Sequence, residues 1–201
     1  MLPKVVGVRG KARHGKDTAA NYLIEKFGFE RPPSFSQALK EMALRALLTC
    51  PPMGYIASLS RDEYEQWAAN PEKFWRKKLW DERDDFSRWI LQFLGTDIFR
   101  NQVDIDYWVD RWYTEAFRMV QQGKKIVVPD VRFKNEAKAI RELGGEIWHV
   151  IRTDAKDLIE GGEYAAAHPS ETEALQITPD RTIAVPTGIE NIHRVIDSFA
   201  H

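Results

Sequence analysis

The chain has 201 residues, with 29 lysines and arginines against 30 aspartates and glutamates, and its formal net charge at pH 7 is −1. This balance produces no global positive field, so nothing in it favours nucleic acid as a partner. The length suits one domain with a substantial core, or one domain that carries an inserted subdomain.

Cysteine usage and hydropathy indicate the compartment. The single cysteine, Cys50, cannot form an internal disulfide bond, as is typical of proteins from reducing compartments. No apolar stretch approaches the ~18 residues of a membrane-spanning helix, and the first residues show no signal-peptide pattern. We therefore expect a soluble, cytoplasmic protein with no membrane partner.

The first predicted elements are a strand, a glycine loop and a helix. An apolar run at 4–8 predicts the strand, and an amphipathic pattern at 19–27 predicts the helix. The stretch between them fits G-x-x-x-x-G-K, a pattern in which loop N–H groups, the helix start and the lysine hold nucleotide phosphates. The alternative is a glycine-rich turn with a surface lysine. The residues expected to contact the nucleotide are Arg13, His14, Gly15, Lys16, Asp17 and Thr18.

The segment from about 34 to 122 is helical in pattern and contains no clear strand. Ser36 is predicted to cap its first helix, and Asn70 is predicted to cap another, with Pro71 at the first helical position. Further helices are predicted from about 84 to 94, ending at Gly95, and from about 106 to 122.

Six of the seven tryptophans lie in this helical segment. Their helical spacing favours core packing, and a base-stacking pocket is the alternative. They are Trp67, Trp75, Trp80, Trp89, Trp108 and Trp112.

The remainder of the chain alternates strands and helices. Strands are predicted at 125–128, 146–151 and 182–185, and helices at about 134–143 and 189–199. This alternation predicts an α/β fold with a mainly parallel central sheet flanked by helices and right-handed crossovers.

Charged residues follow two of these strands. Asp130 and Arg132 come after the strand at 125–128, and Arg152 ends the next strand. Carboxyl ends of parallel strands meet at one sheet edge, so these residues and the glycine loop are expected to lie together. A carboxylate there can hold a metal ion and the arginines can bind phosphate, whereas structural salt bridges are the alternative.

Four blocks of sequence, in order, resemble the deoxynucleoside monophosphate (dNMP) kinases of tailed phages, a branch of the P-loop nucleoside monophosphate (NMP) kinases. The third is the most specific, and the first explains Asp17, because Gly-Lys-Asp is common in this family. The blocks are Gly15–Thr18, Leu91–Thr96 with Arg100 and Trp108–Val109, Asp130–Glu136, and His168–Glu171.

The resemblance implies a P-loop kinase that transfers the γ-phosphoryl group of ATP to a dNMP, giving dNDP and ADP, with Mg²⁺. It implies a core of about 1–33 and 123–201, a helical NMP-binding insertion of about 34–122 and a lid of about 153–178. If a phage encodes the chain, the compartment is the host cytoplasm. Related proteins are often dimers, so a homodimer is one candidate for the oligomeric state of this chain.

The resemblance also implies residue roles. The catalytic residues are Lys16, Asp130, Arg132 and Arg152, and the metal ligands are Asp17 and Asp130. Contacts to adenine are expected from Pro186, Thr187 and Gly188. The dNMP is expected to contact Gln92, Thr96, Arg100, Trp108, Ser170 and Glu171.

Two features leave alternatives open. The lid segment contains no arginine, so either Arg13, Arg132 and Arg152 supply the cations, or the segment faces the nucleoside. The alternatives to a dNMP kinase are a kinase that acts on dephospho-coenzyme A or phosphomevalonate, and a protein that binds nucleotide without turnover. Because the acceptor phosphate is already an oxyanion, neither His14 nor His168 is expected to act as a general base.

Overall fold

The computed structural model describes residues 1–11, 13–82, 84–129, 131–154 and 173–200. The chain divides into two compact units, Met1–Ser34 with Val109–His201, and Phe35–Trp108. Within the described ranges, no helix is both long and apolar enough to cross a bilayer. The second unit ends at Trp108, inside the last helix expected for the insertion, and its role as an NMP-binding subdomain stays a prediction.

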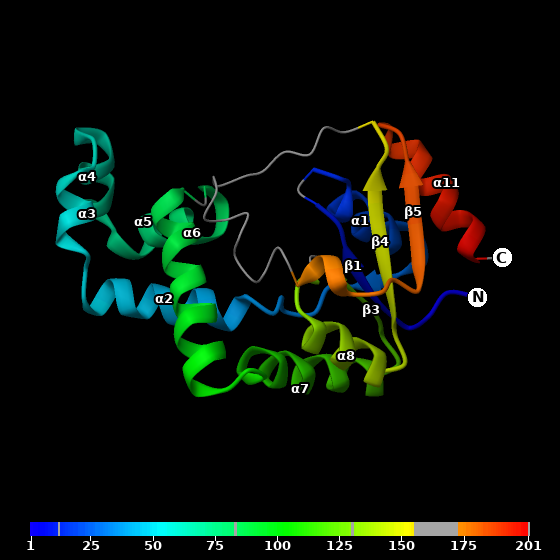
Figure 1. Cartoon of the computed structure of the whole chain (residues 1–201). Helices are drawn as coiled ribbons and strands as arrows, with labels where there is room; N and C mark the ends of the chain where they lie inside the picture. The colour runs from blue at the N-terminus through cyan, green and yellow to red at the C-terminus, as the bar shows by residue number, and fades with distance from the viewer. Residues whose placement is uncertain (12, 83, 130, 155–172, 201) are drawn as a thin grey trace. The chain divides into compact units, whose positions relative to one another are not determined.

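The first unit is built on a five-stranded sheet in the order β2-β3-β1-β4-β5, and every described pair of neighbouring strands is parallel (Figure 1). The predicted α/β fold with a parallel central sheet is confirmed. The strands are β1 (Val5–Arg9), β2 (Phe29–Glu30), β3 (Lys125–Pro129), β4 (Glu146–Arg152) and β5 (Arg181–Val185). Because β1 is central, the loop after it opens at the middle of the carboxyl edge.

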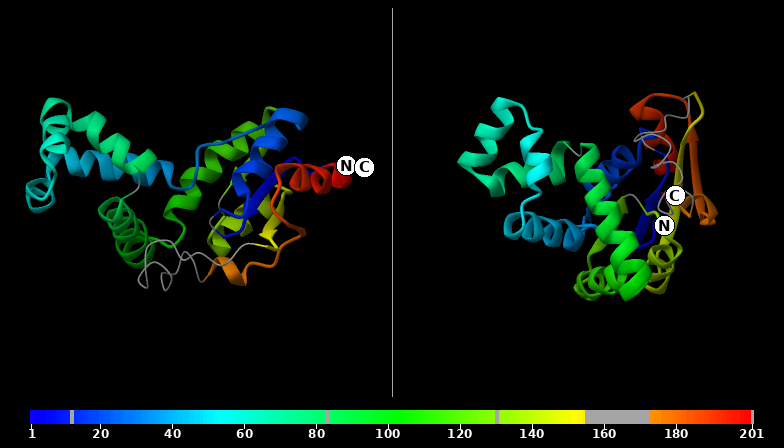
Figure 2. Two further views of the ribbon diagram at one scale, coloured as in Figure 1. Left: turned by 90° about the horizontal axis from the view of Figure 1, so that it is seen from above. Right: turned by 60° about the vertical axis from the view of Figure 1, so that its left-hand side comes forward.

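Helices flank this sheet. Ala19, Leu23 and Ile196 are among the residues through which α1 (Lys16–Phe27) and α11 (Ile189–Ala200) join the cluster of buried strand residues. On the side of Gly7, a Cβ atom would lie 2.7 Å from Ile140 Cδ1 of α8 (Lys134–Glu142), so this helix packs directly on β1. The beginning of the chain and the end of α11 lie side by side (Figure 2). Two further elements are α7 (Tyr107–Gln121) and the 3₁₀ turn η3 (Ala174–Gln176).

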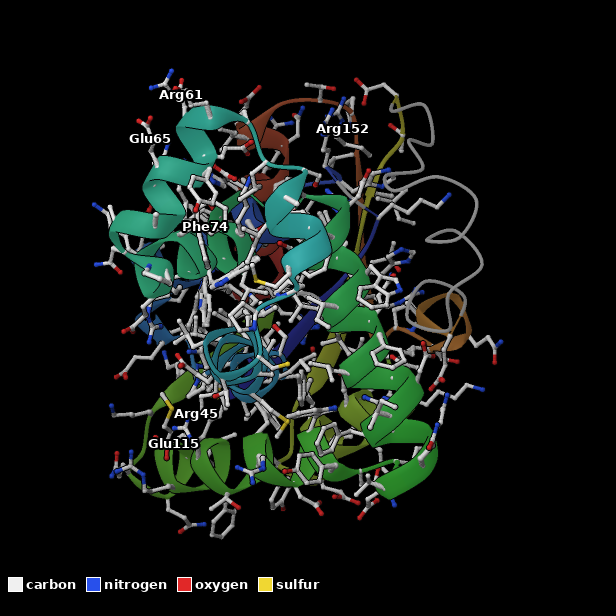
Figure 3. The ribbon with its side chains drawn as sticks, turned by 90° about the vertical axis from the view of Figure 1, so that its left-hand side faces the viewer. Arg45, Arg61, Glu65, Phe74, Glu115 and Arg152 are labelled. Carbon is white, nitrogen blue, oxygen red and sulfur yellow. The ribbon has the colours of Figure 1, made fainter. Side chains whose placement is uncertain are left out.

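Helices are the only regular secondary structure among the described residues of the second unit. Leu44, Trp75 and Leu79 are among its buried core residues, and Arg61 and Glu65 form an ion pair of 3.1 Å on the surface of α4 (Arg61–Ala69) (Figure 3). Its elements are α2 (Gln37–Thr49), α3 (Met53–Ala57), α4 (Arg61–Ala69), α5 (Pro71–Arg76), the π-helix η1 (Lys77–Glu82), α6 (Asp85–Gln92) and the π-helix η2 (Phe93–Val103).

Of the two predicted helix caps, the structure confirms one. The Asn70 side chain accepts from the Lys73 N–H, as expected of a cap, whereas Ser36 lies before α2 with helical φ and ψ and makes no side-chain cap.

Trp75, Trp108 and Trp112 are buried, which confirms core packing for these three. Trp89 is 46% exposed.

Gly95 does not end a helix, and that prediction is wrong. The chain passes from α6 into η2 and stays helical to Val103. A Cβ atom at Gly95 would lie 2.6 Å from Leu39 Cδ2 of α2, so glycine here permits close helix packing.

We expect the free energy of unfolding of Gly95→Ala to be about 1 to 3 kcal/mol lower than that of Gly54→Ala, because the added methyl group must displace the buried Leu39 side chain. Chemical denaturation followed by tryptophan fluorescence measures this. Gly54→Ala is the matched control, because nothing lies within 4 Å of a Cβ atom there. A stability for Gly95→Ala equal to that of Gly54→Ala would contradict the packing role.

Candidate active site

The phosphate-loop pattern lies between β1 and α1, as the sequence predicted. Two loop residues have backbone geometry that favours glycine, Gly10 at φ 153° and Gly15 at φ 99°, while Arg13 adopts φ 62°. A Cβ atom at Gly10 would lie 2.5 Å from the Val150 carbonyl oxygen, so the loop approaches β4 as closely as its backbone allows.

A pocket of about 220 Å³ opens in this loop. Five of the six residues expected to contact the nucleotide line it: Arg13, Gly15, Lys16, Asp17 and Thr18. The Lys16 ammonium group donates to the Lys11 carbonyl oxygen at 3.2 Å, which keeps the lysine over its own loop. The sixth residue, His14, is buried.

His14 connects the loop to the end of β4. Its Nδ1 accepts from the backbone N–H of Arg152 at 3.3 Å. The Arg152 guanidinium group (labelled in Figure 3) in turn donates to the Arg13 carbonyl oxygen at 3.4 Å. Arg152 therefore lies at the phosphate loop, as the sequence predicted, and His14 holds the loop in place.

Asp154 connects β4 to the loop that follows β5. Its Oδ2 accepts from the backbone N–H of Thr187 at 2.9 Å and from the Thr187 hydroxyl at 2.5 Å, and its Oδ1 accepts from Arg152 Nε at 3.4 Å. These hydrogen bonds, above all that from the Thr187 hydroxyl, lower the pKa of Asp154 to about 2. Pro186, Thr187 and Gly188 are thus anchored to the strand that carries Arg152.

The third charged position follows β3. The backbone N–H groups of Arg132 and Phe133 donate to Glu136 Oε2 at 2.8 and 3.1 Å, so a buried carboxylate orders the turn into α8. Val131 donates to the Val8 carbonyl oxygen at 3.0 Å, which holds this turn beside β1. Asp130 lies outside the described residues, as do His168, Ser170 and Glu171 and most of the predicted lid.

The other dNMP-contact residues belong to the unit Phe35–Trp108. Gln92 ends α6, and Thr96 and Arg100 lie in η2. Hydrogen bonds in a π-helix run from i to i+5, so residues four apart stay near one side of the helix. Arg100 donates to the Ile105 carbonyl oxygen at 3.1 Å, and the Trp108 indole to the Gly95 carbonyl oxygen at 3.0 Å. Both Arg100 and Trp108 are buried, and their contacts with a nucleotide stay predictions.

Of the two expected Mg²⁺ ligands, Asp17 and Asp130, only Asp17 is among the described residues. Its side chain is 77% exposed at the loop pocket, and Thr18 lines the same pocket. No cluster of three or more metal-binding side chains occurs among the residues whose placement is described. One or two carboxylates together with substrate phosphates are the usual protein site for this ion, so Asp17 fits the group.

Sequence reasoning missed three residues of this edge, Arg9, His149 and Asp154. Arg9 and His149 lie opposite each other on β1 and β4. The only signal in the sequence was a charged residue closing an apolar strand directly before the glycine loop. Asp154 lies within the range of the predicted lid, and its link to Thr187 spans 33 positions.

A parallel sheet whose central strand runs through a G-x-x-x-x-G-K loop into the first helix defines a P-loop nucleotide-binding protein. A model of the family described as deoxynucleotide monophosphate kinase matches residues 38–163, well over half of the chain. The chain therefore belongs to the deoxynucleotide monophosphate kinase family.

Two relatives resemble this chain. A protein of Acanthamoeba polyphaga mimivirus, whose name assigns it provisionally to the deoxynucleotide monophosphate kinases, is 28% identical over 185 residues, covering 86% of this chain and 83% of the relative. The deoxynucleotide monophosphate kinase of Enterobacteria phage T4 is 34% identical over 70 residues, covering 34% of this chain and 29% of that enzyme.

Proposed function

We propose that this protein transfers the γ-phosphoryl group of ATP to a deoxynucleoside 5′-monophosphate, giving dNDP and ADP. The observation that carries the proposal is the loop pocket, where Lys16, Asp17 and Thr18 lie together with Arg152 close by. Membership of the deoxynucleotide monophosphate kinase family supports the acceptor.

The ATP-binding half of the proposed site follows from the charged residues at the carboxyl edge of the sheet. Phosphoryl transfer depends on positioning and on neutralising the charge that spreads over the transferred group. Loop N–H groups and the start of α1 favour the phosphates, and Lys16 leaves the Lys11 carbonyl oxygen to bridge the β- and γ-phosphates. Arg152 and Arg132 add positive charge, and Asp130 is assigned to the same site from the sequence.

Asp17 is the proposed Mg²⁺ ligand of this loop, joined by Asp130. When bound, the ion neutralises phosphate charge and orients the transferred group. The acceptor phosphate needs no general base, because it is already an oxyanion. His14 accordingly has a structural role, as its hydrogen bond to the Arg152 N–H indicates.

The acceptor half is assigned to Gln92, Thr96, Arg100 and Trp108, with Ser170 and Glu171 from the predicted lid. Arg100 is the residue best suited to the phosphate, since a guanidinium group can bind it through two hydrogen bonds. In this assignment the dNMP-binding residues of the helical unit and the ATP-binding loop belong to different segments of the sequence.

A coupled assay tests the function. With Mg²⁺ present, we expect ADP to form from ATP only when a dNMP is added. ADP formation only with dephospho-coenzyme A or phosphomevalonate would reassign the acceptor, and nucleotide binding without ADP would indicate a module without turnover.

Asp154→Ala is expected to raise the KM for ATP by about fivefold with little change in kcat, because two hydrogen bonds that anchor the predicted adenine loop are lost. The folded-state pKa of Asp154, about 2, lies below its ordinary value, so the anchor is complete above pH ~4 and weakens as the pH falls toward 2. Steady-state kinetics with varied ATP measure the effect.

The exposed Asp62 in the other unit provides the control for this measurement. We expect Asp62→Ala to leave the KM for ATP unchanged. A fall in kcat for Asp154→Ala without a change in KM would contradict the anchoring role and indicate a part in the chemical step.

A further inference from the structure

Arg9 is a buried arginine at the base of the phosphate loop. It is the last residue of β1, and Gly10 follows it as the first residue of the loop pattern. Only 6% of Arg9 is exposed. One terminal nitrogen donates to the Ala174 carbonyl oxygen of η3 at 2.8 Å, while Nε is enclosed without any hydrogen-bond partner in the described part of the chain.

Arg9 has no negatively charged partner among the described residues. Burial alone lowers its pKa, and no carboxylate acts on it there to raise the pKa again. An arginine nevertheless keeps its proton in a protein, so the charge persists. A buried charge without a counter-ion costs folding free energy, which makes its position at the end of the strand that leads into the loop significant.

The ionisable neighbours of Arg9 add no negative charge. His149 lies opposite it on β4, and the pKa of His149 is lowered to about 4, first by burial and then by the positive charges of Arg9, His14 and Lys11. At neutral pH this histidine is uncharged. The described side chains around Arg9 thus leave its charge uncompensated.

We propose that Arg9 is an electrostatic positioning residue of the phosphate loop, whose buried charge acquires its counter-ion when a nucleoside triphosphate binds. The inference rests on the proposed function for the identity of the ligand, and it adds a residue that the loop motif does not include. Arg9 acts across protein of low dielectric constant and does not itself need to touch the phosphates, because charge interactions there extend over several ångströms.

The proposal predicts opposite effects on stability and on binding. Arg9→Met keeps much of the side-chain length and removes the charge. Its melting temperature without ligand should rise by about 2 to 4 °C, because a buried charge is removed at the expense of one hydrogen bond. Its Kd for inorganic triphosphate should rise by about tenfold, because one positive charge is lost near a polyanion.

Two variants serve as controls. Arg9→Lys retains a positive charge, so its affinity for triphosphate should stay within about threefold of the unaltered protein and its melting temperature should not rise. Arg141 also donates to a main-chain carbonyl oxygen, that of Thr178 at 2.6 Å, but it pairs with Asp180 at 3.1 Å on the surface. Arg141→Met should leave triphosphate binding unchanged.

Calorimetric titration of the full chain with inorganic triphosphate, and thermal unfolding with and without it, provide the readouts. Opposite shifts for Arg9→Met, a higher melting temperature and a weaker affinity, support the proposal. The proposal is overturned if this variant fails to fold or melts at a lower temperature, as expected if Asp130 neutralises Arg9 before any ligand binds. An unchanged affinity for triphosphate overturns it as well.

These readouts require no turnover, so they separate this inference from the proposed function. If the unaltered protein phosphorylates a dNMP while Arg9→Met binds triphosphate normally, only the role of Arg9 fails. If Arg9→Met behaves as expected but no dNMP is phosphorylated, the phosphate site stands and the assigned activity fails.

Discussion

Lys16→Ala should reduce kcat/KM for phosphoryl transfer by about a thousandfold or more, because a cation that neutralises the transferred group is lost. The lysine begins α1 and lines the loop pocket, and its stem lies over Gly10, where a Cβ atom would come within 3.4 Å of Lys16 Cγ. In this structure its ammonium group donates to the Lys11 carbonyl oxygen of the loop, so binding of ATP requires a local exchange of that bond for phosphate.

Lys11→Ala is the matched control for this experiment. Lys11 belongs to the same loop and is exposed, and the hydrogen bond to Lys16 uses its main-chain carbonyl oxygen, which the substitution keeps. We expect Lys11→Ala to retain turnover within tenfold. Initial rates over a range of ATP and dNMP concentrations measure both variants, with circular dichroism to verify folding. Lys16→Ala with near-normal kcat/KM would refute the assigned donor site.

Features with a local sequence signal could be predicted. β1, the glycine loop and α1 follow from an apolar run, two glycines and a 3.6-residue period, all within 27 residues. Asn70 before Pro71 likewise identifies a helix start from adjacent residues. The edge position of Arg152 followed from the rule that parallel strands share a carboxyl edge.

Features that depend on distant partners could not be predicted. β2 has only two residues and exists because it pairs with β3, almost a hundred positions later. Gly95 resembles a helix terminator until Leu39 of another helix is seen to fill the space beside it. The π-helical turns of η1 and η2 have no pattern distinct from an α-helix, and the uncompensated charge of Arg9 appears only once its burial is known.

The largest stability effect is expected at Lys78, which lies in η1 and has a side chain only 10% exposed. Its ammonium group lies 3.0 Å from Glu63, 2.8 Å from Glu82 and 3.4 Å from Asp84, while the Tyr55 hydroxyl donates to Asp84 at 2.7 Å. Burial disfavours the charged lysine, but hydrogen bonds with Glu82 and Glu63 outweigh it and raise the pKa of Lys78. One cation thus joins α4, η1 and the start of α6.

These contacts also make the stability depend on pH. Hydrogen bonds from the Ser60 hydroxyl, then from Lys78, lower the pKa of Glu63 to about 2, and those from Lys77 and Lys78 lower the pKa of Glu82. Carboxylates with lowered folded-state pKa values stabilise the fold above their ordinary pKa of ~4. That contribution should be lost as the pH falls from about 4 toward 2.

Lys78→Met should therefore lower the free energy of unfolding at pH 7 by about 2 to 4 kcal/mol. The loss falls below that of a fully buried pair because the three carboxylates are 30% to 38% exposed. Lys77→Met, which removes one pair with Glu82 from a side chain that is 56% exposed, should cost less than about 1 kcal/mol. Five of the seven tryptophans lie in the unit Phe35–Trp108, so their fluorescence during denaturation reports mainly on it. Equal losses for the two variants would show that Lys78 is only another surface charge.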